Sequence, residues 1–433
     1  MAGAGESYEA KCRRNLEVIL GIARRLGSEP RLNPLLENIA SETSNLLDAE
    51  RVTLFLYDRK KNELYSRIAT ESEIEEIRIP ADRGIAGAVA QAGGSFCLNI
   101  PDAYADPRFN PEVDRRTGWR TRNIVAVPML NLDGELVGVL EAMNKRGPGP
   151  NGASAPGFGE DDCSLLSALA AQAGVALERA RLLEEFLAKR RLENEMELAR
   201  DIQMGLLPQN PPQLAGFDLA GWSRPSEYAG GDFYDLFPWG EHRVGLMLGD
   251  AVGHGVGPAL LAAETRALVL ALAMHENRPE KVLADANRLL AQDVTEGRFV
   301  TLALAVLDGA RGTVCYASAG QGPLVILRRN GEAEHLDATG LPLGVLAEAA
   351  VECRPPLEFA PGDALLLLSD GIYECDTAGG GMLGMEAVLE TARRHRERSA
   401  EDILRALAEL TEKANPNGHF RDDRTGVVAK RTA

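Results

Sequence analysis

Apolar residues recur at two different spacings in the first part of the chain. In Asn15–Leu26 and Asn33–Leu47 they return every three or four residues, which is the spacing of one face of an α-helix. Arg51–Tyr57 is instead a short apolar and β-branched run, and the polar turn 58–62 follows it. Such a run predicts a buried strand.

A hairpin and a further helix are predicted downstream. Ile124–Met129 and Glu135–Met143 are apolar runs separated by the turn residues Asn131–Gly134, which is the pattern of a β-hairpin. Pro and Gly dominate the surface loop Arg146–Gly157, and helical spacing resumes in Cys163–Glu178. This alternation predicts an N-terminal domain of mixed helices and strands over residues 14–176.

A charged helical linker follows over residues 177–207. Its apolar positions form two stripes, and the step of five residues between Leu187 and Leu192 puts the second stripe out of phase with the first. A coiled coil with such a break either switches between two registers or is a rigid stalk with a local skip, and both readings stay open. Pro208 ends the helix, because proline disfavours helical geometry in the residue before it. The stripes are Ala176, Ala180, Leu183 and Leu187, then Leu192, Met196, Ala199, Ile202 and Leu206.

The remaining residues, 208–433, have many short strand-like runs and two pairs of helix-like stretches. This pattern predicts two packed antiparallel sheets covered by helices, and it makes the chain an α+β multidomain protein. The predicted strands are Phe217–Trp222, Arg243–Leu248, Phe299–Leu307, Gly312–Ser318, Leu324–Arg328, Ala364–Ser369 and Thr425–Lys430. The predicted helices are Pro258–Glu276, Pro279–Val294, Met385–Arg394 and Ala400–Ala414.

Composition narrows the class of protein. The 433 residues are 45% hydrophobic without an uninterrupted apolar run of about 18 residues, and the N-terminus lacks a secretory pattern, so we expect a cytoplasmic protein without a membrane span. A formal net charge of −17 argues against a nucleic-acid partner, since phosphate binding needs a basic patch. The six cysteines have no Cys-x-x-Cys spacing, which predicts reduced thiols rather than disulfides or a zinc site.

Four aspartates lie where an apolar run meets a glycine or another acid: Asp232, Asp250, Asp370 and Asp422. A strand that ends in this way delivers its carboxylate to the rim of a sheet. Carboxylates gathered in one place repel one another unless a cation compensates them, and oxygen ligands favour hard ions such as magnesium or manganese. Any one of these residues alone could equally cap a turn.

The order of these motifs resembles the SpoIIE/RsbU branch of the bacterial type 2C (PPM) serine/threonine phosphatases. The resemblance covers roughly residues 196–433 and extends to the segment Glu197–Pro208. The motifs that carry it are Ser226–Asp235, Asp250–Gly255, Phe299–Leu302, Ser318–Pro323, Thr339–Gly344, Ser369–Gly371 and Asp422–Thr425.

The resemblance implies an α/β/β/α sandwich and a hydrolytic centre with two Mn²⁺ or Mg²⁺ ions. By family position, Asp250 would bridge both ions, with the Ala251 carbonyl as a further ligand. Asp370 and Asp422 would hold one ion and Asp232 would act mainly at the other, so all four aspartates are the predicted catalytic residues. Asp423 would support these ligands without binding a cation directly.

Other polar residues near these motifs have either a functional or a structural role. His254 lies between two glycines near Asp250, where it either donates a proton to the leaving group or only shapes the loop. Gln321 stands where the family commonly has histidine, which argues against an essential histidine there. Glu227 and Asp235 flank Asp232 and are as readily structural as functional.

Three motifs stand out in the N-terminal domain: Gly84–Gly87, Ile100–Phe109 and Asp114–Asn123. With them the domain resembles a GAF domain of the cyclic-nucleotide-binding type, which implies an α/β sandwich. The signature of that family is present as Asn144-Lys145, Phe158 and Asp162, but its final Glu is Cys163 here. In the family this signature supports the pocket and does not contact the nucleotide.

The GAF resemblance implies a set of residues that would contact cyclic AMP or cyclic GMP. Hydroxyls and backbone amides suit the cyclic phosphate, carboxylates suit the base and ribose, and no arginine is required if amides hold the phosphate. A GAF domain that only dimerises, or that binds another small molecule, is the open alternative. The implied contact residues are Thr53, Ile85, Asp114, Thr117, Thr121 and Glu141.

Together these features predict a dimeric, metal-dependent phosphatase regulated by a GAF ligand. The family resemblance implies a phosphorylated STAS-domain anti-sigma-factor antagonist as the substrate, in a partner-switching pathway. The competing interpretation is a catalytically silent, ligand-responsive scaffold that binds STAS-type partners. A silent scaffold usually loses metal carboxylates, and all four are retained here.

Overall fold

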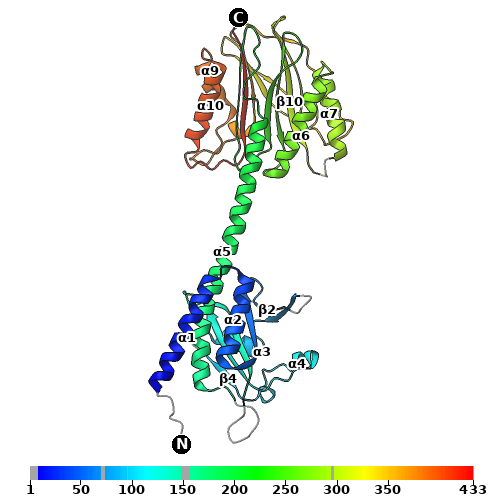
Figure 1. Cartoon of the computed structure of the whole chain (residues 1–433). Helices are drawn as coiled ribbons and strands as arrows, with labels where there is room; N and C mark the ends of the chain where they lie inside the picture. The colour runs from blue at the N-terminus through cyan, green and yellow to red at the C-terminus, as the bar shows by residue number, and fades with distance from the viewer. Residues whose placement is uncertain (1–7, 70–73, 95, 148–156, 294–296, 433) are drawn as a thin grey trace, which may run out of the picture. The chain divides into compact units, whose positions relative to one another are not determined.

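The computed structural model describes residues 8–69, 74–94, 96–147, 157–293 and 297–432. The chain divides into two compact units, Met1–Arg191 and Leu192–Ala433. The long helix α5 (Glu160–Leu206) begins in the first unit and ends in the second (Figure 1). The unit boundary falls inside the predicted step of five between Leu187 and Leu192.

The first unit is a six-stranded antiparallel sheet with helices packed on it. The strand order is β3-β2-β1-β6-β5-β4. Its strands are β1 (Ala49–Asp58), β2 (Glu63–Ala69), β3 (Ile74–Pro80), β4 (Leu98–Ile100), β5 (Ile124–Leu130) and β6 (Leu136–Lys145). Its helices are α1 (Tyr8–Ser28), α2 (Leu32–Leu47), α3 (Gly84–Ala92), η1 (Ala103–Ala105), α4 (Glu112–Thr117) and the first part of α5.

Residue alternation gives this sheet two different faces. On β6, Leu140 and Ala142 pack in the core beneath α1, α2 and α5, whereas Val139 packs in a second core with α3. Glu141, which is also buried, lies between them in sequence and therefore shares the α3 face with Val139. The period of two thus places a carboxylate on the buried α3 side of the sheet.

The predicted helices, first strand and hairpin of this unit are present, but several short elements were not predicted. β2, β3, β4, α3 and α4 each span ten residues or fewer, and much of the predicted loop Arg146–Gly157 lies outside the described residues. Gly118 has a φ of 68° and ends α4. Thr117 and Thr121 therefore do not lie on one continuous helical turn.

The prediction that all cysteines are reduced is wrong for one pair. Cys97 and Cys163 form a disulfide, with their Cα atoms 6.0 Å apart. They are 66 residues apart in sequence, so no short-range spacing pattern could reveal them. The fold brings the residue before β4 to the first turn of α5. Cys315, Cys353 and Cys375 are free thiols.

The second unit contains two five-stranded antiparallel sheets. Their strand orders are β14-β11-β10-β9-β8 and β13-β12-β15-β16-β7. The first sheet has β8 (Asp232–Pro238), β9 (Arg243–Ala251), β10 (Val300–Asp308), β11 (Thr313–Ala319) and β14 (Leu357–Glu358). The second has β7 (Phe217–Arg224), β12 (Leu324–Leu327), β13 (Ala333–Leu336), β15 (Ala364–Leu368) and β16 (Arg424–Arg431).

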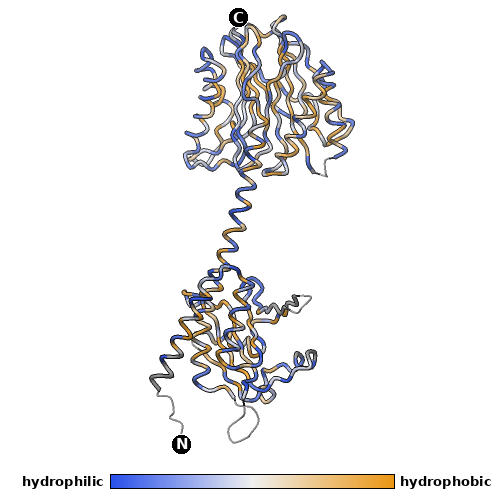
Figure 2. The backbone as a smooth tube through the Cα atoms, viewed as in Figure 1, coloured by the Kyte–Doolittle hydropathy of each residue, from blue (hydrophilic) through white to orange (hydrophobic). Residues whose placement is uncertain are grey.

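Helices cover the outer face of each sheet, which gives the predicted α/β/β/α sandwich. α6 (Val256–Ala273) and α7 (Pro279–Asp293) cover the first sheet, while α8 (Asp370–Tyr373), α9 (Met385–His395) and α10 (Ala400–Ala414) cover the second (Figure 1). A central core between the sheets includes Leu246, Leu365 and Val427. The apolar residues accordingly concentrate in the interior of the unit (Figure 2).

Helix α6 is the one described helix that is long and apolar enough to cross a membrane, by length and composition only. It packs on the first sheet of the sandwich with Leu261, Ala262 and Val269 in the core. Its Arg266 pairs with the buried Asp235 at 2.6 Å. One face of the helix therefore packs on the sheet, and Arg266 has an acidic partner within the unit.

Candidate active site and candidate ligand cavity

The four predicted aspartates come from separate elements of the second unit. Asp232 begins β8 and lies opposite Asp250, near the end of β9. Asp370 begins α8, two residues after the end of β15, and Asp422 lies two residues before the start of β16. Asp232 therefore starts its strand and does not end one, unlike the general pattern expected from the sequence.

The carboxylates are close enough to perturb one another. Burial, together with the charges of Asp422, Asp370 and Asp423, raises the pKa of Asp250 to about 7. Burial, then Asp250 and Asp423, raise the pKa of Asp232 well above its ordinary value. Like charges held together in a partly buried site require a compensating cation or proton.

Asp423 organises the backbone around this acidic cluster. Its Oδ1 accepts hydrogen bonds from the backbone N–H and the hydroxyl of Ser226, at 2.7 and 3.1 Å. Its Oδ2 accepts from the N–H of Asp232 at 3.3 Å. These hydrogen bonds hold the β7–β8 loop in place, which is consistent with the supporting role expected for Asp423.

Glycines allow the loop to approach the cluster closely. A Cβ on Gly230 would collide with the carboxylate of Asp423, and one on Gly231 would collide with the Ala251 carbonyl and lie 2.7 Å from Oδ1 of Asp250. The Ala251 carbonyl, a predicted ligand, therefore faces the same place as the Asp250 carboxylate. Only glycine fits at either position without displacing these groups.

The donor set fits a hard divalent cation. Every predicted ligand atom is an oxygen, and Oδ2 of Asp232 is buried without a hydrogen-bond partner among the described residues. Within the same part of the chain, no three His, Cys, Asp or Glu side chains already have the spacing of a metal site.

The other polar residues singled out in the sequence have local partners. His254 is 77% exposed, and its Nδ1 lies 3.4 Å from Oε2 of Glu227. Asp235 pairs with Arg266, which accounts for its burial by structure alone. Gln321 accepts a hydrogen bond from the Thr301 hydroxyl. None of these contacts involves the four aspartates.

The first unit encloses a cavity of about 480 Å³ on the α3 face of its sheet. Five of the six predicted contact residues line it: Thr53, Ile85, Asp114, Thr121 and Glu141. The side chain of the sixth, Thr117, lies outside the described residues. A cavity of this size lies in the range of small-molecule sites, about 300–1,000 Å³.

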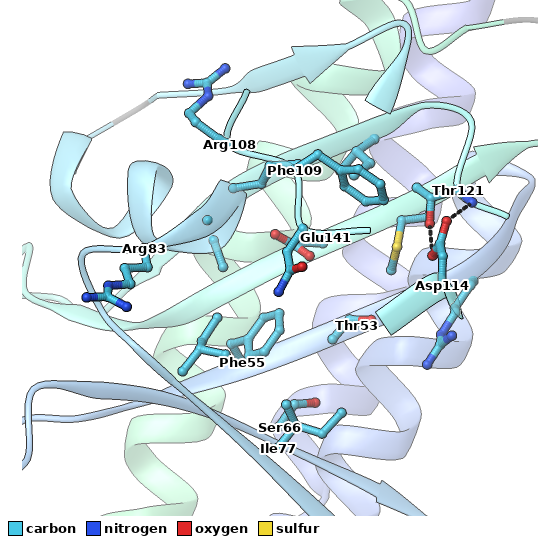
Figure 3. Close-up of a pocket in the computed structure, with 18 of the residues that line it drawn as sticks. Thr53, Phe55, Ser66, Ile77, Arg83, Arg108, Phe109, Asp114, Thr121 and Glu141 are labelled. Carbon is cyan, nitrogen blue, oxygen red and sulfur yellow. Dashed lines mark hydrogen bonds between the residues drawn. The ribbon is translucent and has the colours of Figure 1, made fainter. Parts of the chain in front are cut away.

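One end of the cavity is closed by a network around Asp114. The Thr121 N–H and hydroxyl donate to its two carboxylate oxygens at 2.7 and 2.9 Å, and the Tyr104 hydroxyl donates to Oδ2 at 3.0 Å. Figure 3 shows Asp114 and Thr121 joined in this way. Most of the hydrogen-bonding capacity of Asp114 therefore serves to hold α4 against the start of β5.

Glu141 is the polar group in the cavity that most needs a partner. It lies opposite Thr53 on β1 and Ala126 on β5, and Figure 3 shows it amid the lining residues. Burial raises the pKa of Glu141 to about 7. Its Oε1 atom is buried without a hydrogen-bond partner among the described residues. A ligand with a polar edge would satisfy this carboxyl group.

Three arginines that were not among the predicted contact residues also line the cavity: Arg51, Arg83 and Arg108. Arg83 directly precedes α3, whose first residue Gly84 has a φ of 73°. Arg108 forms an ion pair with Asp106 at 2.6 Å. The signal for Arg83 was its position beside the Gly84–Gly87 motif, since helix N-termini with adjacent cations suit anions.

The GAF signature residues form a scaffold beside the cavity. The Asn144 side chain accepts from the Arg122 N–H at 2.7 Å and donates to the Arg120 carbonyl at 2.9 Å. Lys145 pairs with Asp162 at 2.5 Å and lies over the Phe158 ring. Cys163, which replaces the last signature residue, forms its disulfide next to this pair.

Comparison with known proteins assigns a family to each part. Residues 31–177 match the GAF domain, and residues 240–432 match the family Stage II sporulation protein E (SpoIIE). A dual 3',5'-cyclic-AMP and -GMP phosphodiesterase 11A of Takifugu rubripes is 31% identical over 186 residues. That stretch is 40% of this chain but only 20% of the phosphodiesterase.

Solved structures resemble the second unit. The SiaA-PP2C domain of Pseudomonas aeruginosa has a TM-score of 0.50 and 21% identity, over 57% of this chain and 99% of that domain. The RsbU and RsbW domains of a Mycobacterium tuberculosis protein have a TM-score of 0.43 and 25% identity, over 52% of this chain and 62% of that one. The chain therefore has an N-terminal region that matches the GAF domain and a C-terminal region that matches SpoIIE, and the second unit has the fold of a PP2C domain.

Proposed function

We propose that the chain is a metal-dependent protein serine/threonine phosphatase controlled by a ligand of its GAF domain. The observation that carries the catalytic part is the meeting of Asp232, Asp250, Asp370 and Asp422 in one partly buried place, where burial and neighbouring charges raise the pKa values of Asp232, Asp250 and Asp422. Such a cluster is costly for the fold alone and suits bound cations.

In this proposal the four aspartates and the Ala251 carbonyl hold two Mn²⁺ or Mg²⁺ ions. The bound ions would supply an activated water and neutralise charge on the phosphoryl group. The chain itself positions the carboxylates: β8 and β9 set Asp232 against Asp250, and Asp423 fixes the loop that precedes Asp232. Gly230 and Gly231 keep side chains out of the space beside them.

The proposed substrate is a phosphoserine or phosphothreonine on a STAS-domain anti-sigma-factor antagonist. The domain match and the arrangement of GAF and SpoIIE-type domains support a role in partner switching. With a net charge of −17, the chain would capture a phosphoprotein through the cations at the cluster. We propose a homodimer joined through α5, since Leu183, Leu187 and Leu192 on that helix are 37%, 56% and 54% exposed. We propose the cytoplasm as the location of this enzyme.

The catalytic proposal is tested by hydrolysis of p-nitrophenyl phosphate with and without Mn²⁺. Wild-type protein should require the cation, and Asp370→Asn should be inactive with an unchanged circular-dichroism spectrum. The competing function, a silent scaffold for STAS-type partners, predicts no cation-dependent hydrolysis by the wild type. Activity that persists in Asp370→Asn would contradict the assignment of that residue.

For the GAF domain we propose a cyclic nucleotide, cyclic AMP or cyclic GMP, as the ligand. The cavity of about 480 Å³ offers Oε1 of Glu141, which has no hydrogen-bond partner among the described residues, for a base edge, and the N-terminus of α3 with Arg83 for a phosphate. The similarity to a dual cyclic-AMP and cyclic-GMP phosphodiesterase supports the same class. Titration calorimetry with both nucleotides tests it, and no heat from either at high micromolar ligand would exclude this class.

A further inference from the structure

Gln203 is a buried polar residue near the end of α5, within the segment Glu197–Pro208. It is 9% exposed, whereas its neighbour Ile202 is 61% exposed. Met204, the next residue of α5, and Leu207, which directly follows the helix, pack in or against the core between the two sheets. The last turns of α5 are therefore anchored on the phosphatase sandwich, and Gln203 is the polar contact of that anchor.

The amide of Gln203 pairs with both backbone groups of one residue, Gly230. Its Nε2 donates to the Gly230 carbonyl at 2.7 Å, and the Gly230 N–H donates to its Oε1 at 3.2 Å. Gly230 lies in the loop between β7 and β8, outside any strand ladder. The Gln203 amide thus satisfies the N–H and the carbonyl of Gly230, which would be paired with a neighbouring strand if Gly230 lay in a sheet.

The opposite side of Gly230 faces the acidic cluster. A Cβ there would collide with the Asp423 carboxylate, so Gly230 is enclosed between Gln203 and Asp423. The next residue, Gly231, accepts a hydrogen bond from the Ala251 N–H at 3.1 Å. The residue after that is Asp232, whose own N–H donates to Asp423. Gln203 therefore holds the loop from outside, two residues before a proposed cation ligand.

We propose that Gln203 is a positioning residue that couples the end of α5 to the acidic cluster. The inference rests on the proposed phosphatase function. Because both backbone groups of Gly230 are bound to one side chain, a rotation or shift of α5 displaces the loop and with it the Asp232 carboxylate. A change that begins in the GAF domain would alter cation binding at this contact, since α5 starts in that unit.

The test is Gln203→Met in the full chain, since methionine has a similar length but forms neither hydrogen bond. We expect Mn²⁺ binding, measured by titration calorimetry, to weaken about tenfold, which corresponds to about 1.4 kcal/mol. The Mn²⁺ concentration for half-maximal hydrolysis of p-nitrophenyl phosphate should rise equally, with a smaller change in the rate at saturating Mn²⁺. Unchanged Mn²⁺ binding in a folded variant would overturn the inference.

Asn287→Met is the matched control. Asn287 is also a buried amide that holds a loop backbone, donating to the Leu346 carbonyl at 2.7 Å and accepting from the Gly344 N–H at 2.8 Å. It should lower the melting temperature while leaving Mn²⁺ affinity near the wild-type value. An equal loss of Mn²⁺ affinity in this control would show general loosening and overturn the positioning role.

A second variant keeps the test decisive if Gln203→Met does not fold. Gln203→Asn keeps a neutral amide but is one methylene shorter, so it cannot reach both backbone groups of Gly230; Mn²⁺ binding should again weaken, and wild-type affinity would overturn the inference. Wild-type protein that neither binds Mn²⁺ nor hydrolyses the substrate would instead contradict the proposed function. The two failures are therefore distinguishable.

Discussion

Asp232 and Asp250 are directly paired residues on the antiparallel strands β8 and β9. Residues in such a pair are close, with Cβ atoms about 4.5–5.5 Å apart, and like charges there are destabilising. Asp250 raises the pKa of Asp232 in addition to the effect of burial. The pairing sets two carboxylates side by side at the edge of a sheet, which is unfavourable for the fold unless something binds them.

Asp250→Asn should abolish phosphatase activity without unfolding the protein. We expect Mn²⁺-dependent hydrolysis to fall by roughly three orders of magnitude, the scale of several kcal/mol of charge stabilisation by a bound cation. In EDTA the variant should melt at the same temperature as wild type or higher, because one repelling charge is gone. A variant that retains activity would disprove the cation-bridging role.

Removal of the bound cations should destabilise the second unit and leave the stability of the first unit unchanged. Saturating Mn²⁺ should raise its melting temperature by several degrees, since ligand at about 100 times its Kd adds roughly 2.7 kcal/mol to folded-state stability. EDTA should reverse the effect. The GAF unit, whose described residues include none of the four aspartates, serves as the internal control. Two thermal transitions that both respond equally to Mn²⁺ would argue against a cation site confined to the second unit.

Glu141 should make the stability of the GAF unit depend on pH. Burial raises its folded-state pKa to about 7 from an ordinary value of 4.5. The folded state thus binds the proton more tightly than the unfolded state. Stability is full below about pH 4.5 and is lost as pH rises towards 7, by about 3 kcal/mol at most.

Comparison with Glu141→Gln measures this effect. The melting-temperature difference between the variant and wild type should grow in favour of the variant from pH 5 to pH 8, in the absence of ligand. Asp133→Asn, on an exposed turn of the same unit, is a suitable control. Parallel pH profiles of wild type and Glu141→Gln would show that the Glu141 carboxyl is ionised without cost.

Thr121→Ala should weaken ligand binding in the GAF cavity through Asp114. The hydroxyl of Thr121 donates to Asp114 at 2.9 Å, and its loss frees the end of the cavity that this network closes. We expect a cyclic nucleotide to bind about 1–3 kcal/mol more weakly in titration calorimetry. Thr121→Ser keeps the hydroxyl and should restore most of the affinity. A Ser variant as weak as the Ala variant would point to the methyl group instead.

A single alanine inserted after Arg190 tests the role of α5 in signalling. It would rotate the downstream helix by about 100° relative to the upstream part while leaving the cavity and the acidic cluster unchanged. We expect fixed activity, high or low, without any response to a GAF ligand. Normal basal activity together with a normal ligand response would identify α5 as a passive connector.

The sequence alone determined the elements with strong periodicity and the order of the motifs. α2, α10 and the β5–β6 hairpin follow from local spacing, because their apolar residues recur at the helical or strand period. The motif order identified both domains. Short elements such as β4 and α4 escaped, since three to six residues carry too little periodic signal.

Only the tertiary structure decided which distant residues meet. Three examples each bring together residues from different elements. They are the Cys97–Cys163 disulfide, the hydrogen bond between Gln203 and Gly230, and the cavity that both Arg83 and Arg108 line. Such contacts depend on how strands pair and helices pack, which is a property of the whole core and of no local pattern. The burial that raises the pKa values of Glu141 and Asp250 has the same origin, because a carboxylate loses water only when other parts of the chain close over it.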